Sequence, residues 1–242
     1  MISTGDTRNY NGKKTEVIDM ENSNVKCKDL DDFPMEVFDA VGANLASTKI
    51  ICGGGMASTF DKCFVYKEGG WQYFATMIEG RQNAAGIVNN NTFHIFGGCN
   101  RTSGSYIGLQ SSEIVNEDGS SYEGPQLPKA MYLHAIASVN STVSIISGGR
   151  TSTCTTTYLC IDRYSDQTWY FNHATQEFQP GPNLLEARRY HSSGTITDQE
   201  TKEKIVVVAG GKSKSGVSVW SYYTDSTEIL LNGNWVIGKN HK

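Results

Sequence analysis

The chain has 242 residues, of which 38% are hydrophobic and 19% charged, and its formal net charge is −4 at pH 7. This composition predicts a folded protein with a sizeable core, and the acidic balance provides no basic field for nucleic acid or an anionic membrane. No stretch reaches the roughly 18 apolar residues that span a bilayer, and the opening residues 1–14 are polar, without the apolar core of a signal peptide. We therefore expect neither a nucleic-acid partner nor membrane insertion.

From the N-terminus, a polar tail at residues 1–14 is followed by a short strand, TEVI, at Thr15. A set of four segments comes next. An alternating segment begins at Asp39, an apolar strand ends in a glycine pair at Gly54, a third strand, KCFVY, begins at Lys62, and Trp71 marks a fourth. Short alternating segments bounded by turn residues predict a four-stranded antiparallel unit.

The same order of segments occurs three more times along the chain. The glycine pairs end at Gly54, Gly98, Gly149 and Gly211, with spacings of 44, 51 and 62 residues. A hydroxyl residue opens the third strand at Thr15, Ser112, Thr168 and Thr227, and KCFVY departs from this pattern. The fourth strand carries an aromatic residue at Trp71, Tyr122, Phe178 and Trp235. A period of this length indicates a propeller or a solenoid.

This order of strand, strand with a glycine pair, third strand and aromatic fourth strand resembles the kelch repeat over residues 15–238. The resemblance implies an all-β, kelch-type β-propeller of about four and a half four-stranded antiparallel blades, as an incomplete or unusually small ring. Cys52, directly before a glycine pair, and Cys63, in the following third strand, are similar to a pattern in cysteine-containing invertebrate kelch-like proteins.

The repeats set the expected boundaries within the chain. A half blade covers residues 15–34, and four blades cover residues 35–80, 81–130, 131–187 and 188–238, before the C-terminal end at 239–242. Because the first and second strands occur one time fewer than the third, we expect either a truncated chain or a five-fold ring that lacks half a blade. An open ring exposes strand edges, through which the protein could self-associate.

The segments between the second and third strands are expected to be long loops, at residues 99–110, 150–167 and 212–226. They combine tyrosine, arginine and small hydrogen-bonding residues, as recognition surfaces do. The candidate binding residues in them are Arg101, Tyr106, Arg150, Tyr158, Arg163, Tyr164, Trp220 and Tyr222. A solvated insertion without a ligand is the alternative.

Three further candidates, Arg81, Arg188 and Arg189, stand at the start of first strands. Pointing inward, they would form a rim suited to an acidic peptide, because guanidinium groups bind carboxylates bidentately. The alternative is a structural arginine that bonds carbonyl groups of a neighbouring blade. Two adjacent residues cannot both take that structural place, which favours Arg188 or Arg189 over Arg81 as a ligand contact.

The six cysteines offer two candidate disulfides. Cys52 and Cys63 lie on neighbouring strands, and Cys154 and Cys160 lie in one loop that a bond between them would staple. Cys27 and Cys99 have no assigned partner, and six reduced thiols remain the alternative. The compartment follows from this choice: extracellular if the cysteines are paired and a signal peptide is missing from this chain, and cytoplasmic otherwise.

No residue pattern in the chain assigns a catalytic role. His134 and His191 occupy equivalent repeat positions, which favours a scaffold role, and no metal or cofactor is expected. We expect a scaffold that binds a protein or peptide ligand, with an acidic peptide as one candidate. A kelch-fold enzyme, such as an oxidase, lyase or isomerase, and a propeller fragment without independent function are the alternatives.

Overall fold

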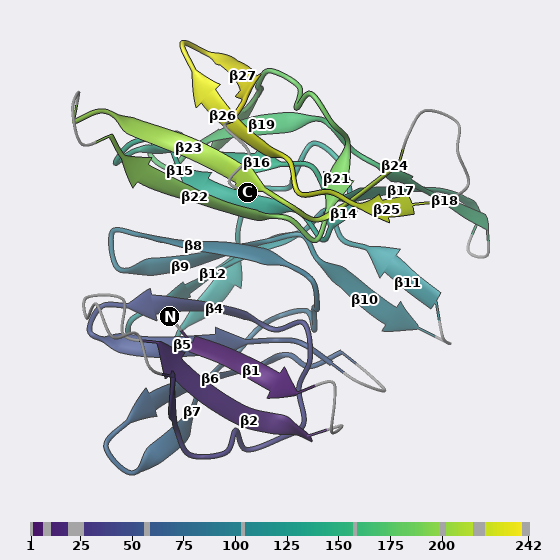
Figure 1. Ribbon diagram of the computed structural model, residues 1–242. Coiled ribbons are helices and arrows are strands. Elements are labelled where there is room, and N and C mark those ends of the chain that lie inside the picture. The colour runs from purple at the N-terminus through teal and green to yellow at the C-terminus, as the bar shows by residue number, and fades with distance from the viewer. Residues whose placement is uncertain are drawn as a thin grey trace. The chain divides into compact units, whose positions relative to one another are not determined.

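The computed structural model describes residues 2–6, 11–18, 27–55, 59–102, 105–156, 159–198, 202–214 and 221–238 (Figure 1). Every regular element in these ranges is a β-strand, which confirms the all-β class. The chain divides into two compact units. The first comprises Met1–Ile95, Cys99–Tyr106 and Glu113–Gly124, and the second comprises Phe96–Gly98, Ile107–Ser112 and Pro125–Lys242.

The described residues form four four-stranded sheets, as the repeats predict. In sheet order, the strands of the first two are β4 (Val41–Leu45), β5 (Thr48–Cys52), β6 (Lys62–Lys67) and β7 (Gly70–Thr76), and β8 (Ala85–Asn89), β9 (Thr92–Phe96), β12 (Ser112–Asn116) and β13 (Ser121–Glu123). Those of the other two are β15 (Ala135–Ser138), β16 (Val143–Ser147), β19 (Thr168–Asn172) and β20 (Glu177–Pro180), and β22 (Ser192–Thr197), β23 (Lys204–Ala209), β26 (Thr227–Leu231) and β27 (Asn234–Ile237).

A three-stranded sheet precedes these four repeats in the sequence. Its order is β1 (Ile2–Asp6), β2 (Asn11–Ile18) and β3 (Cys27–Asp29), and β2 contains the TEVI segment. β1 and the beginning of β2 fall within residues 1–14, the segment expected as a polar tail. β1 pairs antiparallel with β2, so it stands beside TEVI as a second strand stands beside a third.

The segments expected as long loops form β-hairpins instead (Figure 1). β10 (Cys99–Thr102) pairs with β11 (Ser105–Gly108). β14 (Met131–Tyr132), β17 (Arg150–Thr156) and β18 (Leu159–Tyr164) form one small sheet, and β21 (Arg188–Arg189), β24 (Lys212–Lys214) and β25 (Ser221–Tyr223) form another. The β17–β18 segment is rich in threonine and tyrosine, which favour a pleated strand, and pairing satisfies its backbone groups.

The glycine pairs adopt one backbone conformation in all four repeats. The first glycine of each pair has φ between 56° and 68° and the second between 88° and 98°. These angles lie in the left-handed region, where a side chain is strained. At Gly148 the space is also closed, because a Cβ atom would lie 2.7 Å from the carbonyl oxygen of Arg188. The repeated Gly-Gly therefore marks a turn that the fold requires.

Three of the four hydroxyl residues that open third strands donate a hydrogen bond to a carbonyl group of the same repeat. Thr15, Ser112 and Thr168 donate to the carbonyl oxygens of Asp31, Pro125 and Pro182, at 2.5, 2.6 and 2.7 Å. Two of these carbonyl groups also accept a bond from a fourth-strand tryptophan. Trp71 donates to Asp31 at 3.2 Å, and Trp235 donates to Pro182 at 3.0 Å. Each of these two tryptophans thus connects its repeat to the preceding one, whereas the hydroxyl bonds close within a repeat.

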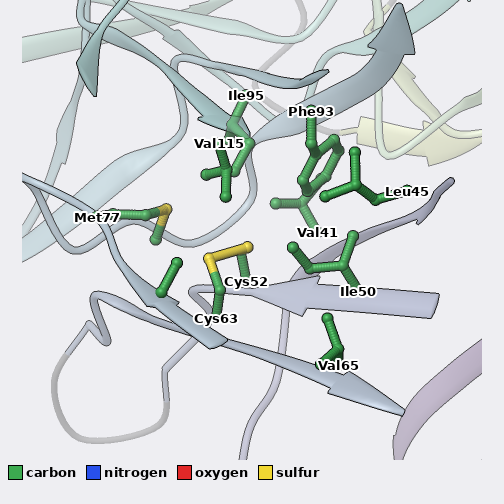
Figure 2. Packing of buried hydrophobic residues seen from close by; sticks show 11 residues of the cluster. Val41, Leu45, Ile50, Cys52, Cys63, Val65, Met77, Phe93, Ile95 and Val115 are labelled. Atoms are coloured by element: carbon green, nitrogen blue, oxygen red, sulfur yellow. A yellow bond between two sulfur atoms is a disulfide. The ribbon is translucent and has the colours of Figure 1, made fainter. Parts of the chain in front are cut away.

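Each unit has its own apolar core between neighbouring sheets. In the first unit, residues of the β4–β7 sheet pack against Phe93, Ile95 and Val115, and Figure 2 shows this cluster around the disulfide between Cys52 and Cys63. In the second unit, Ala137 and Ile145 pack with Val206, Val208 and Trp235. Among the described residues, no helix is long and apolar enough to cross a membrane.

Candidate binding surface

Arg81 forms a buried ion pair inside the second repeat. Its Nη2 lies 3.0 Å from Oε1 of Glu113, and the side chains are 0% and 2% exposed. Glu113 also accepts hydrogen bonds from the backbone N–H groups of Ile78 and Glu79, both at 2.9 Å. The Glu113 carboxylate therefore connects the backbone at Ile78 and Glu79, just before the second repeat, to the third strand of that repeat.

Arg188 repeats this arrangement in the fourth repeat. Its Nη2 lies 2.7 Å from Oε1 of Glu228, which accepts hydrogen bonds from the backbone N–H groups of Leu185 and Glu186 at 2.7 and 3.2 Å. Nη1 donates to the carbonyl oxygens of Gly210 and Ser226. Because both guanidinium groups are buried and bonded within the fold, we build the candidate surface from other residues.

Arg189 takes the opposite direction from Arg188, since successive residues of a strand face opposite sides. Its guanidinium carbon lies 4.7 Å from the ring centroid of Tyr164 and 5.1 Å from that of Tyr190. The Nζ atom of Lys214 lies 5.4 Å from the Tyr164 centroid. Tyr164 on β18 therefore stands next to cations from β21 and β24, so the two small sheets of the second unit meet at this ring.

The charges around Tyr164 change the acidity of its phenol. Burial acts to raise the pKa of Tyr164, but hydrogen bonds with Ser221 and Arg189 and the positive charges of Arg189 and Arg150 lower it overall. The phenol oxygen is thus held as a hydrogen-bond acceptor facing cations.

Further cation and tyrosine pairs extend the surface on both small sheets. Lys212 lies opposite Arg189 in the β21–β24 register, and its Nζ atom is 4.6 Å from the ring centroid of Tyr223. Arg150 lies opposite Tyr132 in the β14–β17 register and 5.4 Å from its ring centroid. We call Arg150, Tyr164, Arg189, Tyr190, Lys212, Lys214 and Tyr223 the tyrosine–cation surface.

The tyrosine–cation surface is open to solvent and carries an excess of positive charge. Tyr223 is 79% exposed and Tyr190 54% exposed. Within the described part of the chain, Arg189, Lys212 and Lys214 form no ion pair with a carboxylate, and Nε of Arg189 is buried without a hydrogen-bond partner.

Tyr222 is held in place by Glu186. Its hydroxyl donates to Oε1 of Glu186 at 2.6 Å, and Thr224 and Ser226 donate to Oε2. Burial alone would raise the pKa of Glu186, but hydrogen bonds, led by that from Tyr222, lower it to about 2. Arg188 also contacts this carboxylate, and Tyr222 lies opposite Ser213 as Arg188 does. Tyr222 therefore belongs to the network of the buried ion pair, on the side of the small sheet opposite the tyrosine–cation surface.

The other sequence candidates lie elsewhere. Arg101 and Tyr106 form a cation–π pair at 5.6 Å in the β10–β11 hairpin of the first unit. Arg163 is exposed on β18, where it neighbours Tyr164 and so faces the opposite side. Tyr158 and Trp220 lie outside the described residues.

Sequence reasoning missed four contributors to the surface, namely Tyr190, Lys212, Lys214 and Tyr223. In three repeats the residue directly after the glycine pair lies opposite the second residue of the repeat, as Arg150 lies opposite Tyr132 and Lys212 opposite Arg189. That spacing is visible in the sequence, and it could have identified Lys212.

The two repeat-equivalent histidines are buried and neutral. Burial lowers the pKa of His134 to about 4. Burial, together with the charges of Arg188 and His134, lowers that of His191 to about 3. Nε2 of His191 lies 3.0 Å from Oγ of Ser147. Among the residues that the structure describes, no group of three or more His, Cys, Asp or Glu side chains could hold a metal ion.

The structure confirms the expected disulfide between Cys52 and Cys63. Cys99 is buried, and its Sγ lies 3.6 Å from the carbonyl oxygen of Gln82. The backbones of Cys154 and Cys160 lie opposite each other on β17 and β18, but their side chains, like that of Cys27, lie outside the described part. No protein-family model and no curated protein matches the chain.

Proposed function

We propose that the chain is a kelch-type β-propeller scaffold that captures an acidic peptide segment of a partner protein on the tyrosine–cation surface. The observation that carries the binding proposal is the position of Tyr164 next to Arg189 and Lys214, which form no ion pair with a described carboxylate. Peptide carboxylates would supply the missing counter-charges, and the tyrosine rings would supply apolar contact area.

The propeller part of the proposal is supported by the repeated local geometry. All four glycine pairs share one backbone conformation, and the tryptophans Trp71 and Trp235 each bond to a carbonyl group of the preceding repeat. Four-stranded sheets that pack against neighbouring sheets through apolar residues favour radial packing. In such a propeller the hairpins that follow the glycine pairs all leave the sheets at the same end, which would gather them on one face.

The binding proposal can be tested with a fluorescent poly-glutamate peptide and anisotropy measurements at low and moderate salt. We expect saturable binding that weakens as salt is raised, since exposed cations make the contacts. Replacing Arg189, Lys212 and Lys214 together by alanine should weaken binding at least roughly tenfold, which corresponds to about 1.4 kcal/mol.

The matched control replaces three exposed lysines outside the surface, Lys28, Lys67 and Lys204, by alanine. It removes the same formal charge, so it separates a local site from the effect of net charge. Equal weakening in both variants, or equal binding of a poly-glutamine peptide, would contradict the proposal.

A further inference from the structure

The backbone register of the β17–β18 hairpin places Cys154 directly opposite Cys160. Pairs in an antiparallel ladder alternate between hydrogen-bonded and non-hydrogen-bonded positions. The N–H of Ser165 donates to the carbonyl oxygen of Gly149 at 2.9 Å, which makes Gly149 and Ser165 a hydrogen-bonded pair. The next pair, Arg150 and Tyr164, is therefore non-hydrogen-bonded. Every second pair along the hairpin is of the same kind, which makes Cys154 and Cys160 a non-hydrogen-bonded pair as well.

Cys52 and Cys63, which are already bonded, occupy the same kind of position. They lie opposite each other on β5 and β6, and the neighbouring N–H of Gly53 donates to the carbonyl oxygen of Lys62. Their pair is therefore also non-hydrogen-bonded, and their Cα atoms are 4.0 Å apart. Such pairs bring Cα atoms to about 4.5 Å, where the Cβ atoms are close enough for a disulfide.

We propose that Cys154 and Cys160 form a second cross-strand disulfide, which pins the β17–β18 hairpin. The two thiols lose two protons and two electrons and become one S–S bond. The oxidant is a small-molecule disulfide such as oxidised glutathione, which is reduced to two thiols through a mixed disulfide.

The position of this bond gives it a role in ligand binding, and that role rests on the proposed function. Arg150 and Tyr164 form the same kind of pair four residues nearer the sheet, so the disulfide lies on the hairpin face that carries them. A bond there holds the register of the two strands and keeps Tyr164 beside Arg189. Pre-organisation of this kind raises affinity by lowering the entropy lost on binding.

The disulfide is tested on the full chain, equilibrated with a glutathione redox buffer and then treated with N-ethylmaleimide. Trypsin cuts after Arg150 and Arg163, so one peptide, residues 151–163, contains both cysteines. We expect mass spectrometry to find this peptide two hydrogens lighter than the dithiol and without added maleimide. The peptides that contain Cys52 and Cys63 should be cross-linked in the same sample, which provides an internal control.

A peptide 151–163 carrying two maleimide groups, or a bond from Cys154 to Cys27 or Cys99, would overturn the proposal. This readout does not depend on the ligand, so failure of poly-glutamate binding leaves it intact. If both proposals hold, a variant with Cys154 and Cys160 replaced by serine should bind poly-glutamate roughly threefold to tenfold more weakly. Cys99→Ser, which removes a buried cysteine of the first unit, is the matched variant.

Discussion

Arg188 and Glu228 form an ion pair at 2.7 Å with side chains 0% and 2% exposed, and Arg81 and Glu113 repeat it in another part of the chain. The third repeat has apolar residues at both corresponding positions, Met131 and Trp169. The two positions therefore change together, from a charged pair to an apolar pair. This is expected where an unpaired buried charge is costly.

We expect Arg188→Met to lower the free energy of unfolding by about 3–5 kcal/mol, because it leaves the Glu228 carboxylate buried without its counter-charge. Adding Glu228→Trp, the combination that the third repeat uses, should recover part of the loss. Urea unfolding of the single and double variants measures both effects. Lys204→Met, at an exposed position, is the control, and a double variant less stable than Arg188→Met would contradict this account.

The glycine pairs allow steric closure and backbone strain to be separated. Gly148→Ala meets both, with φ of 61° and a Cβ position 2.7 Å from Arg188 O and from the His191 ring. Gly210→Ala meets only the strain of φ at 66°, because its nearest neighbour is 3.7 Å away. We expect Gly210→Ala to cost about 1–2 kcal/mol and Gly148→Ala to cost more.

Gly194→Ala is the control for these variants, since a Cβ atom there meets nothing within 4 Å and the backbone is not left-handed. Thermal unfolding should show little change for Gly194→Ala, an intermediate loss for Gly210→Ala and the largest loss for Gly148→Ala. Any other order would show that the turn geometry is not what the repeated glycines preserve.

Much of this fold can be predicted from the sequence, because its signals are local. The glycine pairs, the hydroxyl residue that opens a third strand and the alternating apolar residues each act within a few positions. The Cys52–Cys63 bond could be predicted for the same reason, because the strand order places the two cysteines on neighbouring strands.

The site was harder to predict, because it depends on which way neighbouring side chains face. Arg188 and Arg189 are the same residue type at adjacent positions, so composition does not separate them. In the strand they face opposite sides, and Arg188 is buried beside Glu228 whereas Arg189 lies against Tyr164. The segment from Arg150 to Tyr164 is expected as a loop, but its threonine residues favour a strand and its backbone pairs as a hairpin. Lys214 joins Tyr164 only through that tertiary arrangement.

The Cys52–Cys63 disulfide should stabilise the first unit measurably. It links residues 11 apart in the sequence and lies within the apolar cluster of that unit. We expect Cys52→Ala with Cys63→Ala to lower the free energy of unfolding by about 2–4 kcal/mol. Urea unfolding without reductant measures this, with Cys99→Ala as the comparison. A double variant as stable as the unmodified chain would contradict the prediction.

The buried histidines make stability depend on pH below neutrality. The pKa of His134 is lowered to about 4 and that of His191 to about 3 in the fold, from 6.5 for a free histidine. At pH values between 6.5 and the lowered pKa values, the unfolded chain binds more protons than the folded one. The free energy of unfolding therefore falls as pH falls through 6.5 toward 4. Each histidine contributes a slope of up to about 1.4 kcal/mol per pH unit, and above 6.5 neither contributes.

Replacing a buried histidine by glutamine should therefore flatten the pH dependence. We expect His134→Gln and His191→Gln to lose stability at about pH 7.5 but to lose less of it than the unmodified chain on going to about pH 5. Urea unfolding at several pH values measures the slope, and the comparison across pH separates protonation from packing because the packing loss is common to all values. An unchanged slope in both variants would show that neither ring is kept neutral by the fold.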